Sequence, residues 1–276
     1  MMRHSWISAI LAIIATAGCG SSQSNAPAPP AGAKQEAATT EPSEKEAVTA
    51  LEQLGAAVKL SDGRVAEVDL GKSKATDADL AKLQAFAGLK TLKLTKCPIT
   101  DAGLKYLVHT AKLRMLRLSG TKIDNDGLAQ LAPLTDLREL DLSQTEIGDA
   151  GLAHLEKLPV LTKLNLYSTK VTDAGLVHLA KLKDLKWLNL DKTGISDAGL
   201  PQLEGLAQLE FLHVGRTQVS DAGVGSLAKL TALTKIHVTH TKISDAGVKK
   251  LQQALPHCMI VYKVEEGGQQ AAGSRQ

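Results

Sequence analysis

Apolar residues recur along this chain with one fixed period. A Leu or Val occupies the same place in eight successive segments, each 24 residues after the last and without insertion. One complete unit is residues 161–184, "LTKLNLYSTKVTDAGLVHLAKLKD". A fixed period in this range predicts a solenoid, in which each unit packs only against its neighbours. The aligned positions are Leu80, Leu104, Leu128, Leu152, Leu176, Leu200, Val224 and Val248.

Each unit combines two apolar patterns. Leu164 and Leu166 alternate with polar residues, which predicts a strand with one buried face. Leu176, Leu179 and Leu182 recur at every third residue, which predicts a short helix with one buried stripe. Because one unit cannot cover its own leucines, neighbouring units must stack. The pattern therefore predicts an α/β solenoid with about nine parallel strands on the concave face and eight short helices on the convex face.

The repeated unit L-x-x-L-x-L-x-x-T, followed by a segment close to "TDAGL", resembles the leucine-rich repeat family. The match is to its 24-residue form, as in ribonuclease-inhibitor-like and F-box-associated repeats, and covers about residues 61–263. The resemblance implies a right-handed horseshoe that presents its concave sheet to a partner. The ubiquitin-ligase role of F-box proteins is not expected here, because the chain begins with a secretory signal.

The turn between strand and helix carries a second repeated signal. The ninth position of the unit is usually Asn in the family. Here it is Thr in six successive repeats, from Thr121 to Thr241, and Cys97 in the repeat before them. We expect a ladder of threonine hydroxyls in place of the asparagines. The twelfth position holds residue types favoured at a helix N-cap. The Asp that follows, as in Asp101 and Asp173, is expected to interact with the positive helix end.

The small residues of "DAGL" also have a structural explanation. We expect Gly103 and its equivalents because adjacent turns pack backbone against backbone and leave no room for a side chain. One copy, "IDNDGL" at residues 123–128, moves its acids to Asp124 and Asp126. A carboxylate repeated along the chain belongs to the frame and is not a single active site.

The ends of the repeat array need capping, because a bare terminal unit exposes leucines. Residues 44–60 predict an amphipathic helix that runs into a short strand, and Asp62-Gly63 predicts a hairpin turn. Residues 65–70 then form the first strand in register. We assign residues 44–264 to the repeat domain and expect the Gly/Gln-rich residues 265–276 to be a disordered tail.

The first residues form a separate signal. A basic start is followed by an apolar run at residues 6–18, which is shorter than the about 20 residues that span a bilayer and predicts a signal peptide, residues 1–18. The run ends in "TAGC", which resembles the lipobox of bacterial lipoproteins and implies a lipid on Cys19. The alternative is an ordinary cleaved signal with a chance Cys. Residues 19–43 are expected to be a disordered tether. By resemblance, Gly20 favours the outer membrane, if the cell has one.

Charge and motifs exclude several classes of function. The 32 basic and 29 acidic residues give a formal charge of +3, and both signs alternate on the predicted concave face, so we expect no nucleic-acid partner. No GxSxG, HExxH, CxxC or P-loop pattern occurs. We therefore expect no enzymatic activity and no cofactor. Cys97 and Cys258 lie seven repeats apart and cannot form a disulfide within one molecule.

The aromatic residues indicate a binding surface. They make up only 3% of the chain, yet Tyr167, Trp187 and Phe211 fall on three consecutive strands of the concave face, and His213 and His237 pair on neighbouring strands. Exposed rings bordered by polar groups act as anchors at binding sites. These five residues are the predicted partner-binding site. The alternative is that the Trp/Phe pair only stabilises the sheet.

A metal site and two broader functions complete the alternatives. His213, His237 and His240, with Asp191 as the nearest carboxylate, are candidate metal ligands, but we expect no metal because no carboxylate lies clearly between them.

The favoured function is a monomeric, lipid-anchored scaffold of the bacterial envelope that binds a protein or envelope partner. The alternative is a structural envelope spacer without a specific ligand. The exposed aromatic residues favour the scaffold, because a spacer has no need of them.

Overall fold

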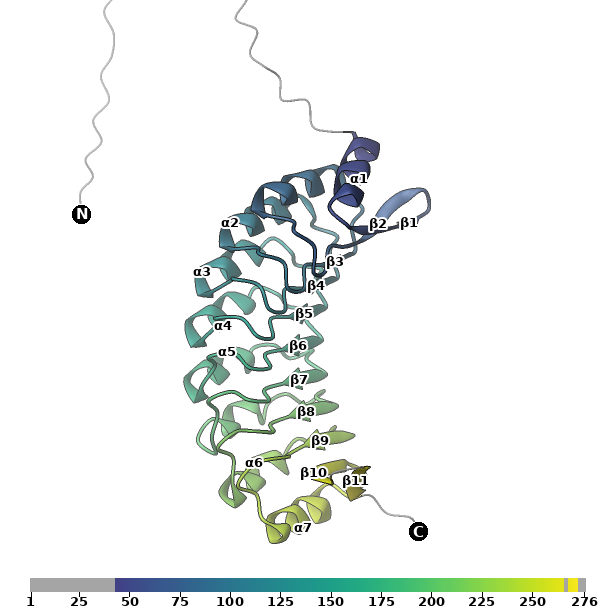
Figure 1. Ribbon diagram of the computed structural model, residues 1–276. Helices are drawn as coiled ribbons and strands as arrows, with labels where there is room; N and C mark the ends of the chain where they lie inside the picture. Colours follow the sequence, from purple (N-terminus) through teal and green to yellow (C-terminus); the bar gives the residue numbers. More distant parts are fainter. Residues whose placement is uncertain (1–42, 266–267, 273–276) are drawn as a thin grey trace, which may run out of the picture. The chain divides into compact units, whose positions relative to one another are not determined.

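The structure is a computed structural model that describes residues 43–265 and 268–272. The predicted signal peptide (residues 1–18), Cys19 and all of the predicted tether except Ser43 lie outside the described residues. The described residues form a single sheet of eleven strands that follow one another in chain order. Figure 1 shows the strands stacked along one side of the repeats and the helical segments along the other. None of the helices in the described part of the chain is long and apolar enough to cross a membrane.

Nine of these strands, β2 to β10, pair in parallel with their neighbours, as the alternating pattern predicts. The strand bounds are β1 Ala57–Ser61, β2 Arg64–Asp69, β3 Thr91–Lys93, β4 Met115–Arg117, β5 Glu139–Asp141, β6 Lys163–Asn165, β7 Trp187–Asn189, β8 Phe211–His213, β9 Lys235–His237, β10 Met259–Glu265 and β11 Gly268–Ala272.

One helical segment contains each aligned Leu or Val position, which gives eight such segments among the described residues. Much of this helix is 3-10 rather than α, because leucines at every third residue match its three residues per turn. After α1 (Glu44–Gln53) the segments are η1 Asp77–Ala85, α2 Asp101–Leu104 with η2 Lys105–His109, α3 Asn125–Leu128 with η3 Ala129–Leu131, α4 Asp149–Leu155, η4 Asp173–Gly175 with α5 Leu176–Leu179, η5 Leu200–Leu203, η6 Asp221–Gly223 with α6 Val224–Leu227, and α7 Asp245–Ala254.

The core lies between the sheet and the helical segments. Leu164 of β6, Leu166 directly after it, and Leu176 and Leu179 of α5 are all fully buried. The equivalent apolar residues of the other repeats join them in one cluster. Each repeat therefore contributes one layer to a continuous core. This arrangement confirms the predicted α/β leucine-rich-repeat solenoid.

Both ends of the parallel sheet are covered by an antiparallel strand. At the first end, Asp62 and Gly63 adopt φ of 53° and 75°, the conformation of a tight hairpin turn, and β1 pairs with β2 as predicted. At the other end, β11 pairs antiparallel with β10. Strand β11 and the last residue of β10 fall within the tail that the sequence predicts, and the predicted domain bounds stay a prediction.

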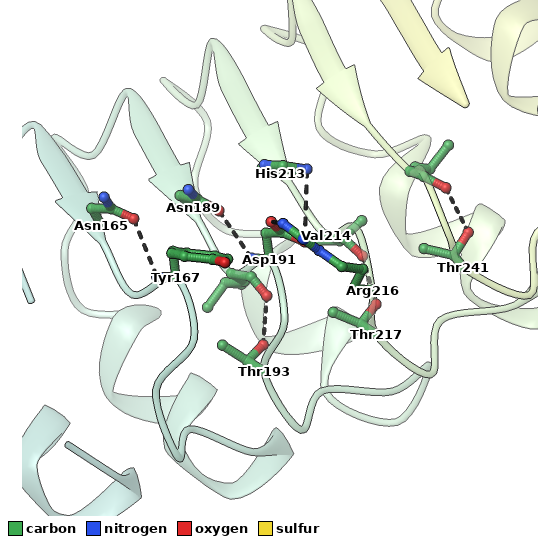
Figure 2. Close-up of polar contacts among 12 residues, drawn as sticks. Asn165, Tyr167, Asn189, Asp191, Thr193, His213, Val214, Arg216, Thr217 and Thr241 are labelled. Atoms are coloured by element: carbon green, nitrogen blue, oxygen red, sulfur yellow. Dashed lines mark hydrogen bonds and ion pairs between the residues drawn. The ribbon is translucent and has the colours of Figure 1, made fainter. Parts of the chain in front are cut away.

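The threonines of the turns satisfy buried backbone groups, but not as a ladder between repeats. Thr169 Oγ1 donates to the carbonyl oxygen of Leu166 at 2.8 Å, within its own repeat, and five other repeats show the same bond. Figure 2 shows this bond at Thr193, Thr217 and Thr241. Cys97, in contrast, donates to the carbonyl oxygen of Leu70 in the preceding repeat at 2.8 Å.

The side chains that do join successive repeats are the aspartates of "DAGL". Asp149 accepts from the backbone N–H of Thr172 at 2.7 Å and from its hydroxyl at 2.6 Å, and Thr172 is the N-cap of the next helical segment. The aspartate was expected to serve its own helix, and its main contacts instead lie one repeat further on. We call this set the aspartate ladder. Its other members are Asp77–Thr100, Asp173–Ser196, Asp197–Ser220 and Asp221–Ser244.

The glycine of "DAGL" makes room for this ladder. A Cβ atom on Gly175 would lie 2.5 Å from Asp149 Oδ1 and 2.9 Å from Leu152 Cδ1. Six equivalent glycines, from Gly103 to Gly247, face the aspartate or asparagine of the preceding repeat in the same way. The predicted lack of space is correct, but a carboxylate occupies the space rather than backbone alone.

The "IDNDGL" copy is a weak point in the ladder, and we expect Asp124→Thr to stabilise the protein. Asp101 faces Asp124 where other repeats offer a hydroxyl, and burial together with the Asp124 charge raises the pKa of Asp101. Threonine would remove the repulsion and still cap the helix. The expected gain is about 1 kcal/mol at pH 7, measured by urea unfolding. Equal stability of variant and wild type at pH 7 would contradict this role.

Candidate functional site

The parallel register of the sheet brings the predicted aromatic residues together. Trp187 pairs with Phe211, and Phe211 with Lys235, so residues at the same repeat position stand side by side. The rings of Trp187 and Phe211 have centroids 4.9 Å apart and planes within 5°, which is a parallel stack. Both side chains are only partly buried. The predicted pair therefore exists and stays open to solvent on the concave face.

Two histidines extend this stack toward β9. The ring of Phe211 lies 5.5 Å from that of His237, and His213 lies 4.7 Å from His237, both in tilted arrangements. We call the four residues Trp187, Phe211, His213 and His237 the aromatic strip. Together they form one continuous cluster of rings across three neighbouring strands.

Tyr167 does not join the aromatic strip. It follows the carboxyl end of β6, whereas Trp187 begins β7, so the two residues lie toward opposite ends of their strands. Its ring instead faces the guanidinium of Arg216, at 5.3 Å from ring centroid to Cζ. The sequence places Tyr167 on the correct face but does not reveal this separation along the strand.

Arg216 is the residue of this region that sequence reasoning missed. It forms a two-point ion pair with Asp191, in which Nε lies 2.9 Å from Oδ1 and Nη2 contacts Oδ2 (Figure 2). Asp191 is only 2% exposed. Arg216 has φ of 51°, and the same left-handed conformation recurs at this position in each repeat from Lys72 to His240. The left-handed conformation favours Gly, but Gly120 is the one glycine among these eight residues. The residue types at this position therefore did not predict the turn.

The proposed metal ligands are not arranged as a metal site. Asp191 is bound to Arg216, and His213 Nε2 lies 3.9 Å from Asp191 Oδ1, beyond hydrogen-bonding distance. Over residues 43–265 and 268–272, no group of three or more His, Cys, Asp or Glu side chains is placed to hold an ion. The cluster consists of aromatic rings and the Asp191–Arg216 ion pair.

The two histidines of the strip are held in the neutral form. Burial lowers the pKa of His213, and the nearby charges of Arg216 and Lys235 lower it further against the opposing effect of Asp191. Burial also lowers the pKa of His237 to about 4, with smaller contributions from His213 and Lys235. At pH 7 the strip therefore presents uncharged rings.

This depressed pKa predicts an acid-sensitive component of stability. The unfolded chain takes up a proton on His237 near pH 6.5, whereas the folded protein does so only near pH 4. The unfolded state therefore binds more protons in this window, and stability is lost as the pH falls from 6.5 to 4. We expect the unfolding free energy of wild type to fall more steeply over this range than that of His237→Asn. Urea titrations at several pH values measure this, with the exposed His109→Asn as the control. Parallel curves for wild type and His237→Asn would contradict the prediction.

Asn165 and Asn189 carry oriented amides beside the strip. Asn165 Oδ1 accepts from the backbone N–H of Tyr167 at 3.1 Å, and Asn189 Oδ1 accepts from that of Asp191 at 2.9 Å (Figure 2). Because each oxygen is held by the backbone, each amide nitrogen is left as a donor. These side chains were not predicted as site residues. The sequence signal that could have predicted them is the occurrence of Asn at the same position of two successive repeats.

A hollow adjoins Trp187 on the side away from Phe211. It has a volume of about 390 Å³ and spans β4 to β7 on the concave face. No sequence pattern predicted it, because its walls come from four different repeats. Its lining includes Met115, Arg117, Glu139, Asp141, Lys163, Asn165 and Trp187.

Comparisons with known proteins agree with this fold. The family model described as "Leucine Rich repeat" matches residues 89–108, 134–155 and 229–251. The crystal structure of internalin C2 from Listeria monocytogenes is 28% identical over 73% of this chain and 82% of that chain, with a TM-score of 0.61. An LRR protein of Leptospira interrogans is 17% identical over 65% of this chain and 56% of that chain, with a TM-score of 0.45. No curated protein matches the chain.

The chain therefore carries leucine-rich repeats and has the leucine-rich-repeat solenoid fold. Proteins of this fold generally serve as scaffolds for protein interaction.

Proposed function

We propose that this protein is a non-enzymatic scaffold of the bacterial cell envelope, lipid-anchored through Cys19, that binds a protein partner at its concave face. The aromatic strip is the centre of the binding surface, with Tyr167 at its border. The observation that carries this proposal is the Trp187–Phe211 stack, which stands partly exposed on the open face of the sheet. We also assign the repeats to the 24-residue "TDAGL" type and the protein to a monomeric state.

The physical properties of the strip suit a protein interface. Trp and Tyr are the residues that most often anchor protein interfaces, and large rings add contact area at a low cost in side-chain entropy. Trp187 and Phe211 already hold each other in place, so little ordering is required on binding. The neutral histidines are also readily covered, because no charge has to be removed from water. A structural spacer gains nothing from these features.

The test is capture of the partner by a strip variant. We expect Trp187→Ser together with Phe211→Ser to weaken partner binding at least tenfold, because both anchoring rings are removed. Partners are first identified by crosslinking in intact cells, and the affinity of the purified partner is then measured. The matched control is Val108→Ser with Val177→Ser, since these residues are 46% and 45% exposed on the helical side. Equal affinity of the strip variant and the control would contradict the proposal and favour the spacer.

The lipid anchor has a separate test. We expect a palmitate analogue to label the wild-type protein and not the Cys19→Ser variant, because Cys19 follows the small residues Ala17 and Gly18 as a lipobox requires. We also expect the wild type to fractionate with membranes, and with the outer membrane where one exists. Labelling that persists in the variant would contradict the anchor at Cys19 without bearing on the aromatic strip.

A further inference from the structure

The hollow beside the aromatic strip has one aromatic wall. Phe211 on β8 covers one face of the Trp187 ring. Trp187 also lines the hollow, which extends from β7 back to β4, and its neighbour at the same repeat position on that side is Lys163. Met115 contributes a second apolar surface, three repeats from Trp187. The volume of about 390 Å³ lies within the range of about 300–1,000 Å³ typical of small-ligand sites.

The polar groups of the hollow balance in charge. Arg117 and Lys163 are basic, and Glu139 and Asp141 are acidic, so the formal sum is zero. Lys163 is already paired with Glu139, whose Oε1 lies 2.8 Å from Nζ. The lining therefore carries no net charge that would attract a charged ligand group. The hollow favours a ligand without net charge.

Free donors and free acceptors lie next to each other in the hollow. Asp141 uses Oδ1 for the backbone and hydroxyl of Ser143, and Asn165 uses Oδ1 for the backbone of Tyr167. Among the described residues, Asp141 Oδ2, the Asn165 amide nitrogen and the Arg117 guanidinium form no hydrogen bond or ion pair. A ligand hydroxyl both donates and accepts, so it can use a neighbouring donor and acceptor at once. Several hydroxyls on one rigid frame match this lining best.

We propose that this hollow binds one ring of a neutral saccharide, stacked on the free face of Trp187. The apolar face of the sugar lies against the indole, and its hydroxyls bond Arg117, Asp141 and Asn165. This ligand goes beyond the protein partner proposed above. The saccharide site lies over β4 to β7, whereas the partner surface is centred on β7 to β9, and only Trp187 is shared.

Tryptophan fluorescence tests the proposal directly. The chain contains only two tryptophans, Trp6 and Trp187, so a full-length chain with Trp6→Phe reports on Trp187 alone. The probes are the tetramer of β-1,4-linked N-acetylglucosamine and cellotetraose, with tetraglutamate and tetralysine as charged comparisons. We expect a saturable change in emission with at least one sugar, with a Kd on the order of 1 mM or tighter for one bound ring. Calorimetry of the same titrations confirms binding independently of the fluorophore.

Matched arginine variants locate the site. We expect Arg117→Gln to weaken sugar binding at least fivefold, and Asp141→Asn to weaken it as well. Arg138→Gln is the control, because Arg138 is exposed beside β5 and does not line the hollow. We expect its affinity to stay within twofold of wild type, with all variants sharing the wild-type melting temperature.

Three results would overturn the saccharide site. They are the absence of a saturable signal with either sugar up to 20-fold above the expected Kd, equal weakening by Arg117→Gln and Arg138→Gln, and binding of a charged peptide but neither sugar. None of these results bears on the protein partner, because that proposal is tested by the affinity of the purified partner for the Trp187→Ser with Phe211→Ser variant, and no sugar takes part in that measurement. Failure of the two proposals can therefore be told apart.

Discussion

Alanine at Gly223 is expected to lower the free energy of unfolding by about 2–3 kcal/mol. The new Cβ atom would lie 2.5 Å from Asp197 Oδ1 and 2.6 Å from Leu200 Cδ1. The Asp197 carboxylate would have to leave the backbone N–H and hydroxyl of Ser220, which it now contacts at 2.7 and 2.5 Å. Charge-assisted bonds of this kind contribute about 1.5–3 kcal/mol each. One methyl group thus breaks one step of the aspartate ladder.

Gly225, two residues further on, provides the control. A Cβ atom there would meet no other atom within 4 Å, and the residue is exposed in α6. Alanine is the better helix former by up to about 1 kcal/mol, so Gly225→Ala should leave stability unchanged or slightly increased. Guanidinium unfolding measures both, and the melting temperature should fall by roughly 4–12 °C in the Gly223 variant only. If both variants lost the same stability, the loss in the Gly223 variant would not come from the aspartate ladder.

Replacement of Arg216 by Met is expected to lower the free energy of unfolding by about 2 kcal/mol at pH 8, which is the second large effect. Asp191 is 2% exposed and would keep its charge without its cation. Breaking a fully buried pair costs about 3–5 kcal/mol, but the Arg216 side chain is 49% exposed and partly screened by water, so we expect less. The Tyr167 ring would also lose its cation contact. Urea unfolding measures the loss, with Arg138→Met as an exposed control expected within about 0.5 kcal/mol of wild type.

This loss should depend on pH in a defined direction. In the wild type the charge of Arg216 lowers the pKa of His213, whereas Asp191 raises it. Without Arg216, the pKa of His213 is higher, and a protonated His213 can replace the missing cation beside Asp191. A raised pKa adds stability at low pH that is lost as the pH rises. The difference between variant and wild type should therefore shrink from pH 8 to pH 5. A constant difference would show that His213 does not respond to Asp191.

The double substitution Arg216→Met with Asp191→Asn completes the test. Removal of both charges should recover part of the loss, because no unpaired carboxylate remains buried. The coupling between the two single variants isolates the ion pair from other effects of each change. If the double variant were as unstable as the sum of both single variants, the ion pair would contribute nothing measurable.

The candidate site was only partly predictable. Trp187, Phe211, His213 and His237 could be placed together because equal repeat positions on parallel strands become neighbours in space. Tyr167 was on the correct face but at the wrong end of its strand. Arg216 and the hollow were not predicted, because a long side chain crosses from one repeat to another and a hollow depends on how four repeats are shaped together.

The sequence by itself determined the frame of this protein. Its leucines recur at two periods within a fixed unit, and each period permits only one kind of buried face, so strands, helices, caps and stacking follow. The tertiary structure alone decided what each polar residue of the unit contacts. Asp149 binds the next repeat, Thr169 its own, and Arg216 the buried Asp191 of the repeat before it. Burial of a leucine side chain does not depend on the direction of its contacts, so the pattern of leucines in the sequence is enough to predict it. Hydrogen bonds and ion pairs depend on distance and angle, which exist only once the repeats have stacked.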